Sequence, residues 1–206
     1  MTTESAKKHT HTLSARVRRR IAMVARWLHI YLSMATFALV LFFSVTGLTL
    51  NHVEWFENAQ KTVMLSGSMP VALLQKPDEL RVVEFIRNTH HIRGAVGDTR
   101  TDDQEYEVTF KGPGYSADAA IDRATGKYQI IETRNGFWAV MNDLHKGRDT
   151  GKAWGWVIDA SAVLLVLVSL TGLALIFFLY KKRTAGLLVA AVGTVVFVAL
   201  YKLFVP

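Results

Sequence analysis

Histidines are the residues of this chain with the most chemistry to offer. The sequence contains seven histidines and no cysteine. The lack of cysteine excludes thiol catalysis, thiolate zinc sites, iron–sulfur clusters and the CxxCH attachment of c-type haem. Four of the histidines lie in polar sequence and are expected to be solvated: His9, His11, His90 and His91. The candidate cofactor ligands are the three that lie beside long apolar segments: His29, His52 and His145.

The elements that must position these histidines are three apolar segments. A helix that crosses a bilayer needs about 20 mostly apolar residues. The sequence therefore predicts transmembrane helices over residues 25–51, 154–180 and 187–204. The first is too long for a cleaved secretion signal, and no small-x-small cleavage site precedes Asn51, so we expect it to remain as an anchor.

Positive charge sets the expected orientation of these helices. Lys and Arg are concentrated in the tail of residues 1–24 and in the short loop 181–186, which predicts that both segments are cytoplasmic. Residues 52–153 and the C-terminus should then lie outside. The formal net charge of +7 follows from the cytoplasmic flanks beside anionic lipid, so the expected partner is the bilayer and not nucleic acid.

The outer segment predicts a small α+β domain. A loop that contains Ser66 to Pro70 precedes a helix that begins at Pro77-Asp78-Glu79 and runs to about Thr89. Three strand-like runs separated by Gly-containing turns follow, over residues 106–110, 115–122 and 127–133. A further helix, with apolar residues at helical spacing from Phe137 to Leu144, leads to His145.

Depth in the membrane limits which histidines can share an iron. The 23 residues between His29 and His52 span about 34 Å of helix, the full hydrocarbon thickness, so these two cannot bind one metal. His145 can lie at the depth of His52, and two imidazoles there could ligate one b-type haem. Alternatively, these interfacial histidines bind only lipid headgroups or backbone.

Two glycines and one acid complete the candidate site. The sequence S-V-T-G-L-T-L at Ser44 recurs as S-L-T-G-L-A-L at Ser169, which suggests a weak inverted repeat. Gly47 and Gly172 could admit a flat cofactor, or simply allow close helix packing. Asp159 is the only acid within a predicted span, where it could fix a histidine tautomer, take up a proton, or pair with Arg148 or Lys152.

These elements together resemble the PepSY-associated transmembrane family. The resemblance rests on R-W-L-H at Arg26, the turn D-R-A-T-G at Asp122, D-L-H-K-G-R at Asp143 and the paired T-G-L segments. It implies an α-helical membrane protein of the bacterial inner membrane, with three transmembrane helices and a periplasmic PepSY-like α+β domain. Larger members have four spans, whereas this chain has three and the third contains no histidine, so His29 has no obvious partner on the cytoplasmic side. Either His29 is not a ligand, or a second subunit supplies the other half of that site.

The resemblance also implies a function, because some members of the family are b-haem ferric-siderophore reductases. The expected function is transfer of electrons through haem b to a periplasmic acceptor such as a ferric siderophore. The chain would then be a membrane ferric-chelate reductase or a subunit of one, working as a homo-oligomer or with a redox partner. The alternative is a haem-free anchor whose outer domain binds or regulates a periplasmic protein. Soluble hydrolytic catalysis is not expected, because no HExxH, GxSxG, Walker A or GxGxxG pattern occurs.

Overall fold

A computed structural model describes residues 2–75 and 79–206. The chain divides into two compact units, which we describe separately. One unit is Leu41–Asp159 and contains the sheet domain with the adjoining ends of two long helices. The other unit combines Met1–Val40 with Ala160–Pro206.

Three helices are long and apolar enough to cross a membrane, as predicted: α1 (Thr2–Asn51), α5 (Gly151–Ile176) and α6 (Arg183–Phe204). Very few residues of these apolar stretches are buried inside the chain, as expected for helices that face lipid. The structure starts α5 three residues before the predicted position 154 and α6 four residues before 187, while α5 ends at Ile176 instead of 180. The protein is therefore a membrane protein with three candidate spans.

The α+β domain contains an antiparallel sheet of five strands. The strands are β1 (Lys61–Ser68), β2 (Ala95–Thr101), β3 (Glu105–Gly112), β4 (Tyr115–Asp122) and β5 (Lys127–Arg134), in the order β1-β5-β4-β3-β2. The meander β3-β4-β5 confirms the predicted runs. The loop predicted around Ser66 to Ser68 was wrong, because these residues pair with Gln129 to Lys127 of β5.

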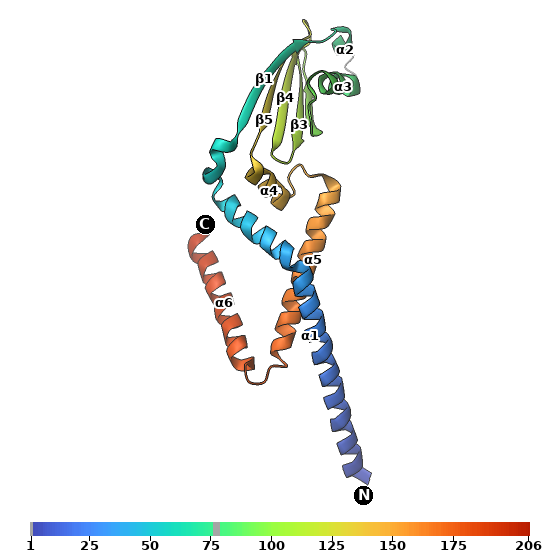
Figure 1. Cartoon of the computed structure of the whole chain (residues 1–206), viewed down its shortest axis with the longest axis vertical. Coiled ribbons are helices and arrows are strands. Elements are labelled where there is room, and N and C mark those ends of the chain that lie inside the picture. The colour runs from blue at the N-terminus through green and yellow to red at the C-terminus, as the bar shows by residue number, and fades with distance from the viewer. Residues whose placement is uncertain (1, 76–78) are drawn as a thin grey trace. The chain divides into compact units, whose positions relative to one another are not determined.

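Helix α3 (Glu79–His90) covers one face of this sheet (Figure 1). Its buried residues Val82, Val83 and Ile86 belong to the same apolar core as Phe110 and Ile130 of the sheet. The predicted start of this helix at Pro77-Asp78 lies outside the described residues. The short helix α2 (Ala72–Gln75) precedes it.

Two short elements join the sheet to the long helices. The 3₁₀ helix η1 (Val53–Ala59) links α1 to β1, and α4 (Phe137–Lys146) links β5 to α5. Helix α4 confirms the predicted amphipathic helix before α5. It ends at Gly147, whose left-handed φ of 70° lets its N–H reach the carbonyls of Asp143 and Leu144. The Asp143 carboxylate also accepts a hydrogen bond from the N–H of Gly114, 2.8 Å away, which ties α4 to the β3–β4 turn.

Candidate functional site

His145 lies in the last turn of α4 and its ring is seated on α1. Its Nδ1 is 2.6 Å from the hydroxyl of Thr46, and its ring meets that of Phe43 edge-on at 5.1 Å. A Cβ on Gly47 would lie 3.7 Å from Cε1 of the imidazole. One turn of α1, from Phe43 to Gly47, therefore forms the seat for this ring.

The hydrogen bonds around Thr46 fix the tautomer of His145. The Thr46 hydroxyl donates its single proton to the carbonyl of Phe42, 2.6 Å away. Nδ1 of His145 must then be the donor to Thr46 Oγ1, and Nε2 of the neutral ring keeps its lone pair. Burial lowers the pKa of His145, and the neighbouring charge of Lys146 lowers it further by a smaller amount. Both effects favour this neutral form.

A second hydrogen bond lies one helical turn away. The hydroxyl of Thr49 donates to the side-chain oxygen of Asn142 at 2.6 Å. Asn142 and His145 are three residues apart on α4, and Thr46 and Thr49 are three residues apart on α1, so each pair shares a helix face. The two hydrogen bonds hold α4 against the end of α1.

His29 has the same arrangement in the other unit, where α1 meets α5. Its Nδ1 is 3.0 Å from the hydroxyl of Thr171 and 3.2 Å from the carbonyl of Val168. The Thr171 hydroxyl donates to that same carbonyl at 2.9 Å, so Nδ1 of His29 is again the donor and Nε2 keeps its lone pair. A Cβ on Gly172 would lie only 3.0 Å from Cε1 of His29.

Both T-G-L segments therefore seat a histidine from elsewhere in the chain. Thr46 and Gly47 hold His145, and Thr171 and Gly172 hold His29. The sequence repeat predicted either close helix packing or a cofactor notch at the two glycines. In the structure an imidazole ring fills the space over each of them.

His52 takes different partners from His145. Its Nδ1 lies 3.1 Å from the carboxylate of Glu54, and its ring stacks on Trp55 at 4.2 Å with an interplanar angle of 3°. A backbone hydrogen bond lowers the pKa of Glu54, and the hydrogen bond with His52 lowers it further. The ionised carboxylate therefore accepts a hydrogen bond from Nδ1 of His52. His52 lies five residues past Gly47, roughly 8 Å along a helix axis. The sharing of one iron by His52 and His145 stays a prediction.

Two other polar residues differ in their surroundings. His90 was predicted to be solvated, and this was wrong: it is half-buried, and its Nε2 lies 2.8 Å from the hydroxyl of Tyr128. No local pattern signals this contact, which depends on how α3 docks on β5.

Asp159 is exposed on α5, and the described part of the chain gives its carboxylate no hydrogen bond or ion pair. Its predicted role beside a histidine stays a prediction.

The described residues contain no group of three or more His, Asp or Glu side chains placed to hold a metal ion. No curated protein and no solved structure matches the chain. Residues 23–206 match the family model PepSY_TM_like_2, described as PepSY_TM-like, which covers the sheet domain, two candidate spans in full and the first span from residue 23 onward. The chain belongs to this PepSY-associated transmembrane family.

Proposed function

We propose that this protein is a b-haem electron-transfer protein of the bacterial inner membrane. In this proposal the N-terminus is cytoplasmic, and residues 52–153 and the C-terminus are periplasmic. The concentration of Lys and Arg in residues 1–24 and 181–186 supports this orientation. Electrons pass outward to a periplasmic acceptor, and a ferric siderophore is the acceptor that the family resemblance favours.

The observation that carries the proposal is the state of three ring nitrogens. His29, His52 and His145 each commit Nδ1 to a hydrogen bond, and no described residue bonds their Nε2. A histidine ligand of a metal usually has this form, because a hydrogen bond at the second nitrogen fixes the tautomer and the ring orientation. His90 is a useful contrast, since its Nε2 is already engaged by Tyr128.

Imidazole nitrogens are suitable ligands for haem iron, and each seat offers one imidazole. His29 would hold one haem and His145 another, each through Nε2. A bound haem would supply one-electron iron chemistry. Thr171 and Thr46 fix the orientation of the His29 and His145 rings through Nδ1. Gly172 and Gly47 allow these rings to approach the helix backbone. A second imidazole would come from His52 at the His145 seat, or from a second copy or partner chain at His29.

The spectrum of the detergent-purified protein tests this function. We expect a Soret band and a reduced α-band on addition of dithionite, with the haem-to-protein ratio measured by pyridine haemochrome. His29→Ala and His145→Ala should each lower that ratio. His90→Ala is the matched control and should leave it unchanged, because that ring bonds Tyr128 through Nε2. A colourless protein from haem-sufficient cells would contradict the proposal.

A second function has its own supporting observation. The face of the sheet opposite α3 carries exposed Met64 and Ile131 on neighbouring strands, and β1 and β2 are edge strands. An open face and free edges suit a membrane-anchored module that binds a periplasmic protein. This reading predicts that residues 52–153 keep the biological activity when they are fused to an unrelated anchor. Loss of activity from a folded fusion would favour the haem proposal.

A further inference from the structure

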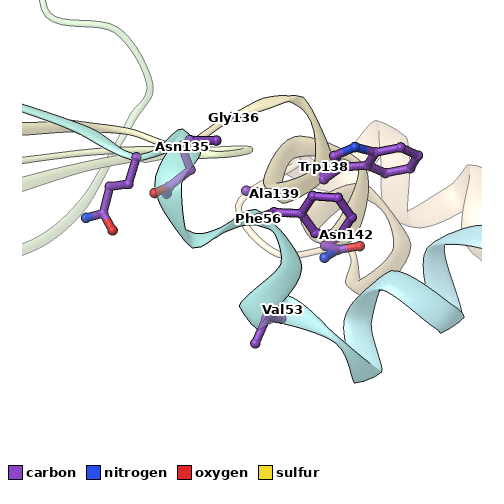
Figure 2. Close-up of a pocket in the computed structure, with 9 residues that line it drawn as sticks. Val53, Phe56, Asn135, Gly136, Trp138, Ala139 and Asn142 are labelled. Atoms are coloured by element: carbon purple, nitrogen blue, oxygen red, sulfur yellow. The ribbon is translucent and has the colours of Figure 1, made fainter.

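A small cavity lies between η1 and the start of α4, within the unit that contains the sheet. It has a volume of about 110 Å³. None of the residues that line it is ionisable: Val53, Phe56, Ala59, Gln60, Asn135, Gly136, Trp138, Ala139 and Asn142. Figure 2 shows Phe56, Trp138 and Asn142 close together in its wall.

The side chain of Asn142 is the polar feature of this wall. The residue is only 6% exposed, and its amide oxygen accepts the hydrogen bond from Thr49. No described residue accepts a hydrogen bond from its amide nitrogen. The amide nitrogen is thus available as a donor in a cavity that carries no charged group, which suits a molecule that brings an acceptor oxygen to Asn142. Gln60 and Asn135 offer further amide groups in the same lining.

The apolar part of the wall is aromatic. The rings of Phe56 and Trp138 pack with centroids 5.2 Å apart and a tilt of 31°. Next to them in sequence, Trp55 and Phe137 are 58% and 65% exposed. Exposed aromatic residues beside a membrane span mark the level of the lipid headgroups. The cavity therefore lies where a membrane-soluble molecule can reach it.

We infer that this cavity binds the head of a quinone or quinol, a neutral flat ring with two hydrogen-bonding oxygens. The lining carries no cation to balance a phosphate, so a phospholipid headgroup does not match its chemistry. A glycerol ester brings carbonyl oxygens but no flat ring to place against Phe56 and Trp138. A quinone brings both, with Asn142 as donor to one of its oxygens.

This inference deepens the proposed function, because a quinol is a class of electron donor that reaches the protein through the bilayer. Binding itself does not require haem. The cavity is also connected to the outer histidine seat: Asn142 bonds Thr49, and one turn away Thr46 bonds His145.

Titration with ubiquinone-1 tests the site in the full-length, detergent-purified protein, with tryptophan fluorescence as the readout. We expect saturable quenching. Ala139→Leu, which fills the cavity, and Asn142→Leu, which removes the donor, should each raise the Kd roughly tenfold. Ala153→Leu is the control, because Ala153 is exposed on α5 and does not line the cavity. Circular dichroism checks that each variant is folded, and if Asn142→Leu unfolds, Ala139→Leu alone carries the test.

Each result has a defined meaning. Quenching that rises linearly with quinone and is equal in Ala139→Leu would overturn the inference, because it reports partition into the micelle. Complete displacement of the quinone by a short-chain diacylglycerol at equal concentration would also overturn it, in favour of a lipid ester. Saturable binding to colourless protein would support the cavity and remove the haem proposal, whereas a haem protein without saturable binding would do the reverse.

Discussion

Substitution of the two seat glycines by alanine should have opposite effects. At Gly172 the new Cβ would lie 3.0 Å from Cε1 of His29, well inside the usual carbon–carbon contact of about 3.5–4.0 Å. The ring cannot retreat freely, because Nδ1 is held at 3.0 Å by Thr171 and 3.2 Å by the Val168 carbonyl. Overpacking of this kind costs about 1–3 kcal/mol. At Gly47 the corresponding distance is 3.7 Å, an ordinary contact, so only the helix preference of alanine should be felt.

Gly193→Ala on α6 provides the baseline for that preference, because nothing lies within 4 Å of its Cβ position. Alanine in a helix is favoured over glycine by about 0.5–1 kcal/mol. Thermal unfolding in one detergent, followed by circular dichroism, should therefore rank Gly172→Ala below wild type, and Gly47→Ala and Gly193→Ala at or above it. Equal losses in Gly172→Ala and Gly47→Ala would refute the reasoning that a rigidly held imidazole sits on Gly172.

Three further predictions concern the sheet domain and the seat of His145. Gly126→Ala should destabilise the sheet domain by more than about 1 kcal/mol in urea unfolding, since φ is +71° and the new Cβ would collide with the Met69 carbonyl. Hydrogen bonds from Thr125 lower the pKa of Asp122. The ionised carboxylate therefore stabilises the folded domain above about pH 4, and this contribution is lost as the pH falls through the lowered pKa. Asp122→Asn should remove this part of the acid dependence of unfolding. Thr46→Val removes the acceptor of His145 Nδ1 and should shift the midpoint potential of any bound haem without lowering the haem ratio as far as loss of the ring does.

The sequence predicted those parts of the fold that leave a local pattern. The spans follow from long apolar runs, and β3 to β5 follow from alternation between Gly-containing turns. The edge strands lack such a pattern. In β1 only Leu65 is even half-buried, and β2 contains Gly97 and a register shift between Val96 and Thr99. Their strand conformation depends on the neighbours with which they pair.

The candidate site was only partly accessible from the sequence. Histidines beside apolar segments and a repeated T-G-L could be recognised from residue type and spacing. Which ring occupies which glycine could not, because the contacts His29–Thr171 and Thr46–His145 join residues more than 90 positions apart. The cavity has the same origin, since its lining comes from η1 and from the start of α4.

The pairing of β1 with β5 has a mechanical consequence. These two strands lead directly to η1 and α4, and therefore to the ends of the two spans, and both connections leave the ladder at the pair Lys61–Arg134. A force that separates α1 from α5 would first load the hydrogen bonds that hold α4 against α1, Thr46–His145 and Thr49–Asn142. Once these are broken, it would load the pair Lys61–Arg134. The hydrogen bonds between β1 and β5 would then break one pair at a time toward Ser68–Lys127, because the force acts at one end of the ladder. The sheet would therefore open from the end that adjoins η1 and α4, before the core between the sheet and α3 is disturbed.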